Sequence, residues 1–303
     1  MEDERELDLA AQALGVSREE VSGLSELKKG MTNHSFLFQC KGKKYIMRIP
    51  GEGTDKLINR REEAAVYQII RGRDICDNVI YIAPDSGYKI TEYMEGARAC
   101  DPYDWKDVRK CMVKLRQFHE MHLRAEHTFD LFRMIDFYES LRNRRPSMYS
   151  DYEETKKRVQ SLRIFVANQN PEQTLTHMDA VPDNFLIVSG GEGKEDIRLI
   201  DWEYAGMQDP HVDIAMFCVY AMYDKDQADK LIRVYFTEGC RHCTKIKIYC
   251  YIAICGLLWS NWCEYKSLLG VKFGKYALRQ YQFAKEFSLL AINEIKRLDE
   301  DRE

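Results

Sequence analysis

One histidine, two aspartates and an asparagine form the strongest chemical pattern in the sequence. His177 is followed by Asp179 and, after four intervening residues, by Asn184, while Asp201 follows a later apolar run. Alternating apolar residues between positions 175 and 200 predict a hairpin that presents the last three side chains together. Carboxylate and amide oxygens suit magnesium, and a carboxylate can also orient a hydroxyl proton. The pattern predicts a magnesium site beside a general base.

The spacing of this motif is that of a kinase catalytic loop. In that arrangement Asp179 accepts or orients the proton of the acceptor hydroxyl, and Asn184 and Asp201 hold magnesium on the nucleotide phosphates. A surface hairpin with incidental turn-forming residues would explain either element alone, but not both in this order. We therefore expect phosphoryl transfer, with His177 as a structural hydrogen-bond partner rather than a proton carrier.

The residues expected to bind the nucleotide lie in the first third of the chain. Arg48 stands on the strand where a kinase places its phosphate-holding lysine, and arginine can bind phosphate bidentately. A solvated charge at an alternating position is the alternative for Arg48. Glu62 and Glu63 are adjacent on the next helix, so only one can face Arg48, and Glu63 is favoured. The full expected set combines a loop before the first hairpin, this pair and a hinge: Thr32, Asn33, Ser35, Arg48, Glu63, Glu92 and Met94.

The elements that must position these groups fall into two regions. Period-two patterns predict a hairpin over residues 35–49 and strands at 79–82 and 88–93, with a helix at 58–70 between them. Two short helices are expected between residues 6 and 26, the second opened by a capping box at Ser17 and Glu20. Beyond residue 103 the chain reads as mostly helical: 105–122, 134–142, 151–168, 224–239, 245–269 and 273–298. The predicted fold class is α+β and bilobal, with a β-rich lobe at 1–95, a hinge at 92–96 and a helical lobe at 96–303.

Composition limits the classes of partner. The 303 residues are 45% hydrophobic and 31% charged, with formal net charge -4, which is typical of a globular chain and gives no basic excess for nucleic acid or membrane. The acidic N-terminus is unlike a secretory signal, and the apolar run at 249–259 is too short to span a bilayer. Ten cysteines scattered through apolar segments favour a reduced, cytoplasmic setting. Zinc binding at Cys240 and Cys243 would need a second ligand pair, so core and helix-end thiols are the favoured interpretation.

Taken together, residues 25–300 resemble the choline and ethanolamine kinase family, within the aminoglycoside phosphotransferase-like superfamily. The resemblance is carried by five signature residues and by three local runs: His177, Asp179, Asn184, Asp201 and Glu203, with 30–33, 48–54 and 59–60. It implies a protein-kinase-like bilobal fold, ATP and Mg²⁺ as cofactors, Asp179 as base, and Asn184 and Asp201 on the metal. Glu203 belongs to the same acidic element and is expected as a further metal ligand. Asp213 is expected to buttress the catalytic loop.

The resemblance also implies choline as the acceptor, with ethanolamine or an aminoglycoside-type alcohol as the alternative. A quaternary ammonium offers no N–H donor, so aromatic faces and nearby carboxylates must recognise it. The rings expected to do so, beside Asp179, are Tyr204, Tyr223, Trp259, Trp262 and Tyr276. Core packing is the competing interpretation for each ring. A pseudokinase is disfavoured because base and metal ligands are all present; a second copy of the chain could pair through the N-terminal helices.

Overall fold

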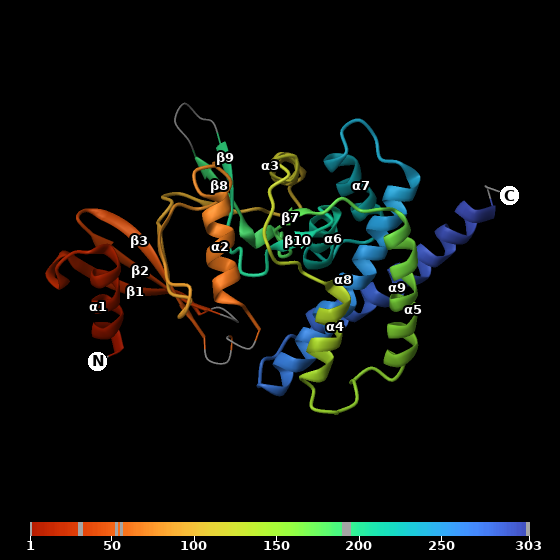
Figure 1. Cartoon of the computed structure of the whole chain (residues 1–303), viewed down its shortest axis with the longest axis horizontal. Helices are drawn as coiled ribbons and strands as arrows, with labels where there is room; N and C mark the ends of the chain where they lie inside the picture. Colours follow the sequence, from red (N-terminus) through yellow and green to blue (C-terminus); the bar gives the residue numbers. More distant parts are fainter. Residues whose placement is uncertain (1, 30–32, 52–53, 55–56, 190–194, 301–303) are drawn as a thin grey trace. The chain divides into compact units, whose positions relative to one another are not determined.

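The computed structural model describes residues 2–29, 33–51, 54, 57–189 and 195–300. Contacts divide the chain into two compact units (Figure 1). The first contains Met1–Cys100 and Asp183–Ala205, and the second contains Asp101–Pro182 and Gly206–Glu303. The mixed α+β class expected from the sequence is confirmed. The lobe boundary near residue 95 stays a prediction, and the hairpin that follows Asp183 clusters with the first unit.

A five-stranded antiparallel sheet forms the centre of the first unit. Its order is β1-β2-β3-β5-β4, with bounds Val21–Lys29, Asn33–Cys40, Lys43–Pro50, Lys89–Glu92 and Val79–Ile82 in that order. Helix α1, Glu2–Leu14, contributes Leu7, Ala10 and Ala11 to a buried apolar cluster with Phe38, Met47 and other strand residues. Since side chains alternate along a strand, Met47 joins this cluster while its neighbour Arg48 points to the opposite face.

Helix α2, Arg60–Ile70, follows β3 and is capped at its N-terminus by the Asn59 side chain, which accepts from the amides of Arg61 and Glu62. Its buried positions include Glu63 and Tyr67. Tyr67 accepts a hydrogen bond of 2.5 Å from Lys89 Nζ on β5, so the helix packs on the sheet face that carries Arg48 and Lys89.

A second sheet in the first unit has the order β6-β8-β9, with bounds Arg98–Ala99, Phe185–Ser189 and Glu195–Leu199. The amide of Leu199 donates to Ile75 O at 2.8 Å, which ties this hairpin to the segment after α2. The hairpin between residues 175 and 200 is thus present as expected, and residues 190–194 of its turn lie outside the described part.

The second unit is mainly helical. Its helices are α3 Trp105–His119, α4 Leu131–Ser140, α5 Tyr152–Asn168, α6 His211–Tyr220, α7 Lys225–Tyr235, α8 His242–Leu268 and α9 Lys275–Glu300. Helix α8 packs against α4, α5, α6 and α9 (Figure 1). It is long and apolar enough to cross a membrane, but 94% of its most apolar window is buried inside the protein, as in the core helix of a globular unit.

A two-stranded ladder positions the loop that holds His177 and Asp179 within this unit. Strand β7, Thr174–Thr176, pairs antiparallel with β10, Gly206–Gln208. The pairing sets the loop that begins at His177 beside the start of α6, which carries Asp213. The two segments are more than thirty residues apart in the chain, so the ladder makes their contact possible.

The structure differs from the expected elements in two places. Residues 21–29 form strand β1 instead of a second short helix, although the Ser17–Glu20 capping box is present on a single 3-10 turn at Arg18–Glu20. Pairing with β2 along its length stabilises this polar strand. Helix α6 was not expected because eight of its ten residues are buried, which leaves no polar face to give helical periodicity.

Candidate active site

In the second unit, the loop that holds Asp179 is fixed through its backbone. The Asp213 carboxylate accepts hydrogen bonds from the amides of His177 at 2.9 Å and Met178 at 2.8 Å. His177 is fully buried, and its Nδ1 accepts from the Asp179 amide at 3.2 Å. Met178 has a left-handed φ of 67°, a conformation that side chains rarely adopt without support from their surroundings. The buttressing expected of Asp213 is confirmed.

In the first unit, Asn184 and Asp201 lie at adjacent ends of the β8–β9 hairpin. The amide of Ile200 donates to Asn184 O at 2.9 Å, which brings the backbone before Asp201 alongside Asn184. Asp201 has a left-handed φ of 66°, the second strained non-glycine position of the motif. Its side chain is 32% exposed, so the carboxylate remains accessible to a ligand.

Arg48 lies among three carboxylates of the same unit. Its Nη2 contacts Glu63 Oε1 in a very short ion pair, and its Nη1 lies 2.7 Å from Asp201 Oδ1 and 3.5 Å from Glu203 Oε2. The expected pairing of Arg48 with Glu63 rather than Glu62 is therefore present. We call Glu63, Asp201 and Glu203 the acidic cluster; one oxygen of each lies within 4.8 Å of the others.

Arg60, which the sequence reasoning gave no role of its own, holds the buried side of this cluster. Its Nη1 lies 3.0 Å from Glu63 Oε2 and 3.1 Å from Glu203 Oε2. Asn33 donates to Glu203 Oε2 at 2.9 Å and accepts from Arg60 Nη2 at 3.1 Å. Asn33, expected to approach phosphate, thus holds Glu203 in this structure. The family-like Asn59-Arg60 pair was the available sequence signal for Arg60.

Burial and charge determine the proton affinities here. Burial alone would lower the pKa of Arg48, but Glu63, Asp201 and Glu203 outweigh it and raise that pKa. Burial, with Asp201 nearby, raises the pKa of Glu203. With every group ionised, the two guanidiniums and three carboxylates carry a net charge of −1. Hard oxygen donors and residual negative charge fit a magnesium ion, and Asp201 is the exposed member of the cluster through which it could bind.

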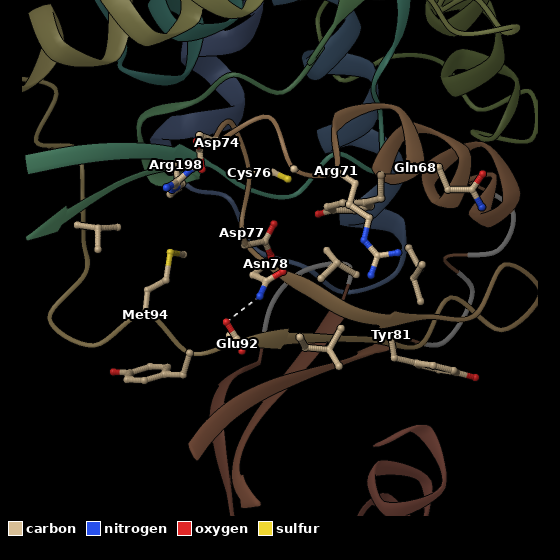
Figure 2. A pocket seen from close by; sticks show the side chains of 17 residues that line it. Gln68, Arg71, Asp74, Cys76, Asp77, Asn78, Tyr81, Glu92, Met94 and Arg198 are labelled. Carbon is tan, nitrogen blue, oxygen red and sulfur yellow. Dashed lines mark hydrogen bonds and ion pairs between the residues drawn. The ribbon is translucent and has the colours of Figure 1, made fainter. Parts of the chain in front are cut away.

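The expected hinge residues Glu92 and Met94 line a cavity of about 590 Å³ in the first unit (Figure 2). Its other walls come from the end of α2, β4 and the β8–β9 hairpin. Glu92 accepts from Asn78 Nδ2 at 2.7 Å at the centre of this view. Asp77 beside it is buried, and burial, partly opposed by Lys89, raises its pKa. Arg48 and Glu63 do not line this cavity.

Ser35 and Thr32 are the two remaining residues that were expected to bind the nucleotide. Ser35 on β2 pairs in register with Arg48, so both belong to one stretch of the sheet. Thr32 lies outside the described residues.

An aromatic cluster forms in the second unit from three of the expected substrate rings. Trp259 and Trp262 on α8 meet edge to face with centroids 5.5 Å apart, and Trp262 meets Phe273 at 5.4 Å. Phe273 then lies 6.3 Å from Tyr276, which in turn meets Tyr220 at 6.0 Å. Phe273 and Tyr220 were not among the expected site residues; Phe273 was expected to begin a helix and instead lies in the loop before α9. Tyr220, Phe273 and Tyr276 are half-buried, so the cluster has an accessible side.

Two other expected substrate rings lie apart from this cluster. Tyr223 is fully buried, stacks on Trp105 at 5.6 Å and donates its hydroxyl to Pro102 O in a very short hydrogen bond. Tyr204 is buried in the first unit, 7% exposed, directly after the acidic cluster in sequence.

Comparison with known proteins gives a consistent result. The family model of choline/ethanolamine kinase matches residues 24–237. Protein LicA of Haemophilus influenzae is 28% identical over 275 residues, which cover 86% of this chain and 98% of that protein. The crystal structure of choline kinase LicA from Streptococcus pneumoniae superposes with a TM-score of 0.80 at 28% identity, over 95% of this chain and 99% of that one. A structure of LicA in complex with AMP gives a TM-score of 0.79 at 28% identity, covering 95% and 98%.

Proposed function

The chain belongs to the choline/ethanolamine kinase family, and we propose that it transfers the γ-phosphate of ATP to the hydroxyl of choline, giving phosphocholine and ADP. It is an ATP-dependent small-molecule kinase with a protein-kinase-like α+β fold. Choline rather than ethanolamine is the finer part of the proposal. The observation that carries it is the aromatic cluster around Trp262.

We assign Asp179 as the residue that contacts the acceptor hydroxyl. Two backbone amides held by Asp213 fix the chain immediately before this residue, so the position of its backbone is well defined. A fixed carboxylate can accept or orient the hydroxyl proton as the oxygen attacks phosphorus, and positioning supplies much of the rate in this chemistry.

We assign Asp201 and Asn184 as the magnesium ligands. Glu203 has a supporting role, because it pairs with Arg48 and Arg60. The exposure of Asp201 and the contacts of the buried Glu203 Oε2 with Arg60 and Asn33 support this division. When bound, the metal would neutralise charge on the nucleotide phosphates. Arg48, with five fixed donors, is suited to contact the same phosphates.

We assign the backbone of residues 92–94, at the expected hinge, as the part of the chain that binds the adenine. The cavity beside Glu92 and Met94 and the AMP complex of a similar protein support a nucleotide at this unit.

The aromatic cluster is assigned to the choline head group. Trimethylammonium binds to ring faces and edges through cation–π attraction, which contributes about 0.5–2 kcal/mol per favourable ring. Trp262 already lies 5.8 Å from the Lys266 ammonium, so a cation is tolerated beside this cluster. A pocket specific for ethanolamine would instead need acceptors for its three N–H donors.

Initial rates of ADP release with choline, ethanolamine and kanamycin test the proposal. We expect magnesium-dependent, saturable turnover with kcat/KM at least about 10-fold higher for choline than for ethanolamine, equivalent to about 1.4 kcal/mol. Preference for ethanolamine would retain the kinase and reject the choline assignment, and turnover with kanamycin alone would reject both amino alcohols.

A further inference from the structure

One indole nitrogen of the aromatic cluster is hydrogen-bonded to a methionine of a neighbouring helix. Trp259 Nε1 donates to Met216 Sδ at 3.1 Å, and the two side chains come from α8 and α6, which pack against each other (Figure 1). The exposed fractions are 9% for Trp259 and 1% for Met216, so bulk water does not compete for this donor. A buried indole N–H usually finds a partner, and here a polarisable thioether provides it.

This contact constrains the orientation of the Trp259 ring. Trp259 meets Trp262 edge to face, with the two ring planes at 80°. Ring packing has no preferred direction at the indole nitrogen, whereas a hydrogen bond does. Trp262 Nε1, by comparison, is buried without a hydrogen-bond partner among the described residues. Met216 therefore gives the tryptophan pair a directional contact that ring packing does not supply.

Met216 lies on a face of α6 that also reaches the catalytic loop. Asp213, Met216 and Tyr220 are spaced i, i+3 and i+7, which places them on one side of a helix. Asp213 holds the backbone of the catalytic loop, Met216 holds Trp259, and Tyr220 meets Tyr276. One helix therefore carries the contacts that place the loop and two rings of the aromatic cluster.

We infer that Met216 is a positioning residue for acceptor binding: its Sδ holds the Trp259 ring in the orientation that the cationic head group requires. The inference rests on the proposed function, in which the aromatic cluster binds that head group. Cation–π attraction depends on which part of the ring faces the cation, so a rotated indole binds it less well. Asp213 keeps its own contacts with the loop when Met216 is changed. The KM for the acceptor should therefore rise while kcat and the KM for ATP change little.

Two substitutions separate the hydrogen bond from the packing. Met216→Leu keeps an apolar side chain of similar volume, which cores tolerate, but removes the acceptor. Met216→Gln keeps the length of the side chain and offers a carbonyl oxygen to the indole, although it buries an amide NH₂ group. A role in packing alone predicts that leucine is mild and glutamine harmful. The inference predicts the opposite order for the KM of the acceptor.

We expect the KM for choline to rise about 3- to 10-fold in Met216→Leu, the effect of losing one modest hydrogen bond. The kcat and the KM for ATP should stay within about twofold of wild type. In Met216→Gln the KM for choline should stay near wild type, even where the melting temperature is lower. Met112→Leu, at a buried methionine of α3 in the same unit, is the matched control and should leave all three constants unchanged.

The indole N–H resonances give a second readout that is independent of turnover. Protein labelled with ¹⁵N-tryptophan contains four indole groups, and Trp259→Phe identifies the resonance of Trp259. Met216→Leu should shift this resonance and leave that of Trp202, whose Nε1 donates to Leu199 O at 2.7 Å, in place. Titration with tetramethylammonium chloride should move the Trp259 resonance in wild type. The Kd from this titration should be about 3- to 10-fold higher in Met216→Leu.

An unshifted Trp259 resonance in Met216→Leu would show that the contact does not exist in solution, and would overturn the inference. A choline KM and a tetramethylammonium Kd that match wild type in Met216→Leu, or a KM raised equally in both variants, would reduce Met216 to packing. Should Met216→Gln fail to fold, the comparison of Met216→Leu with Met112→Leu decides. A wild-type protein that binds tetramethylammonium at Trp259 but transfers no phosphate to choline would reject the proposed function, whereas the Kd comparison would still decide the inference.

Discussion

Arg48 Nη1 lies 2.7 Å from Asp201 Oδ1, so the cation expected to hold phosphate contacts the carboxylate expected to hold magnesium. Arg48 is almost fully buried while Asp201 is partly exposed, and Glu63 holds the other guanidinium nitrogen from α2. The proposed phosphate ligand and the proposed metal ligand are therefore already joined in one ion pair. The same contact explains why three carboxylates can lie this close together in a buried site.

Replacing Arg48 by methionine should destabilise the protein by about 3 kcal/mol at pH 7, because buried Glu63 and Glu203 would lose one of their two cationic partners and keep only Arg60. Burial already raises the pKa of Glu203 and Arg48 lowers it, so the substitution raises that pKa further. A carboxyl whose pKa is higher in the folded state loses its stabilising contribution as pH rises. The deficit should thus be smallest near pH 4 and grow toward pH 7 in urea unfolding.

Arg61→Met is the matched control for this substitution. Arg61 is adjacent in sequence to Arg60 but its side chain is 78% exposed, and within the described part of the chain its one ion pair is with exposed Asp85. Its loss should cost less than about 1 kcal/mol at any pH. Equal costs for Arg48→Met and Arg61→Met would contradict the role given to Arg48.

Asp201→Asn and Glu203→Gln should separate catalysis from stability. Asp201 is partly exposed, so its neutral isostere should leave the melting temperature nearly unchanged and lower kcat at least about 100-fold through loss of a metal ligand. Glu203 is buried against Arg48, Arg60 and Asn33, so its isostere should lower the melting temperature by several degrees. Full activity in Asp201→Asn, measured as magnesium-dependent ADP release, would remove Asp201 from the metal site.

The aromatic cluster can be tested with two tyrosines of one helix. Tyr276 belongs to the cluster, whereas Tyr281 stacks on Tyr149 at 3.8 Å and donates to Asp151. Tyr276→Leu should raise the KM for choline about 3- to 30-fold, as expected for one cation–π contact, without changing the KM for ATP. Tyr281→Leu should leave both constants near wild type. A choline KM unaffected by Tyr276→Leu would return this cluster to a packing role.

Gly256 allows α8 and α9 to approach closely. A Cβ at this position would lie 2.7 Å from Phe283 Cβ, 2.8 Å from Ala284 N and 2.8 Å from Gln280 O, and two of those atoms are backbone. Gly256→Ala should destabilise the protein by about 1–3 kcal/mol through overpacking. In open space the same change would stabilise a helix by about 1 kcal/mol. The sign of the change in unfolding free energy therefore decides whether this contact exists in solution.

The local arrangement of the expected catalytic residues could be predicted from the sequence because it depends on short spacings. His177, Asp179 and Asn184 fall within eight residues, and Asp201 ends the partner strand of the same hairpin. The alternating strands around Arg48 were equally visible. In each case a period of two, or a fixed loop length, was enough to place the side chain.

The partners of these residues could not be predicted because they are distant in sequence. Asn33 meets Glu203 across 170 positions and Arg60 meets it across 143, while His119 reaches Asp213 across 94. No periodic pattern encodes such contacts. Strand β1 was mistaken for a helix for a related reason, since its polar sequence becomes a strand only through pairing with β2.

The central claim is tested most directly by following the γ-phosphate of ATP by ³¹P NMR in the presence of choline, with wild type and Asp179→Asn compared at equal concentration. The account predicts a phosphocholine resonance with wild type and a rate about 100- to 10,000-fold lower with Asp179→Asn, the usual contribution of a positioned base. Equal rates in the two proteins, or release of inorganic phosphate with no phosphocholine, would contradict it.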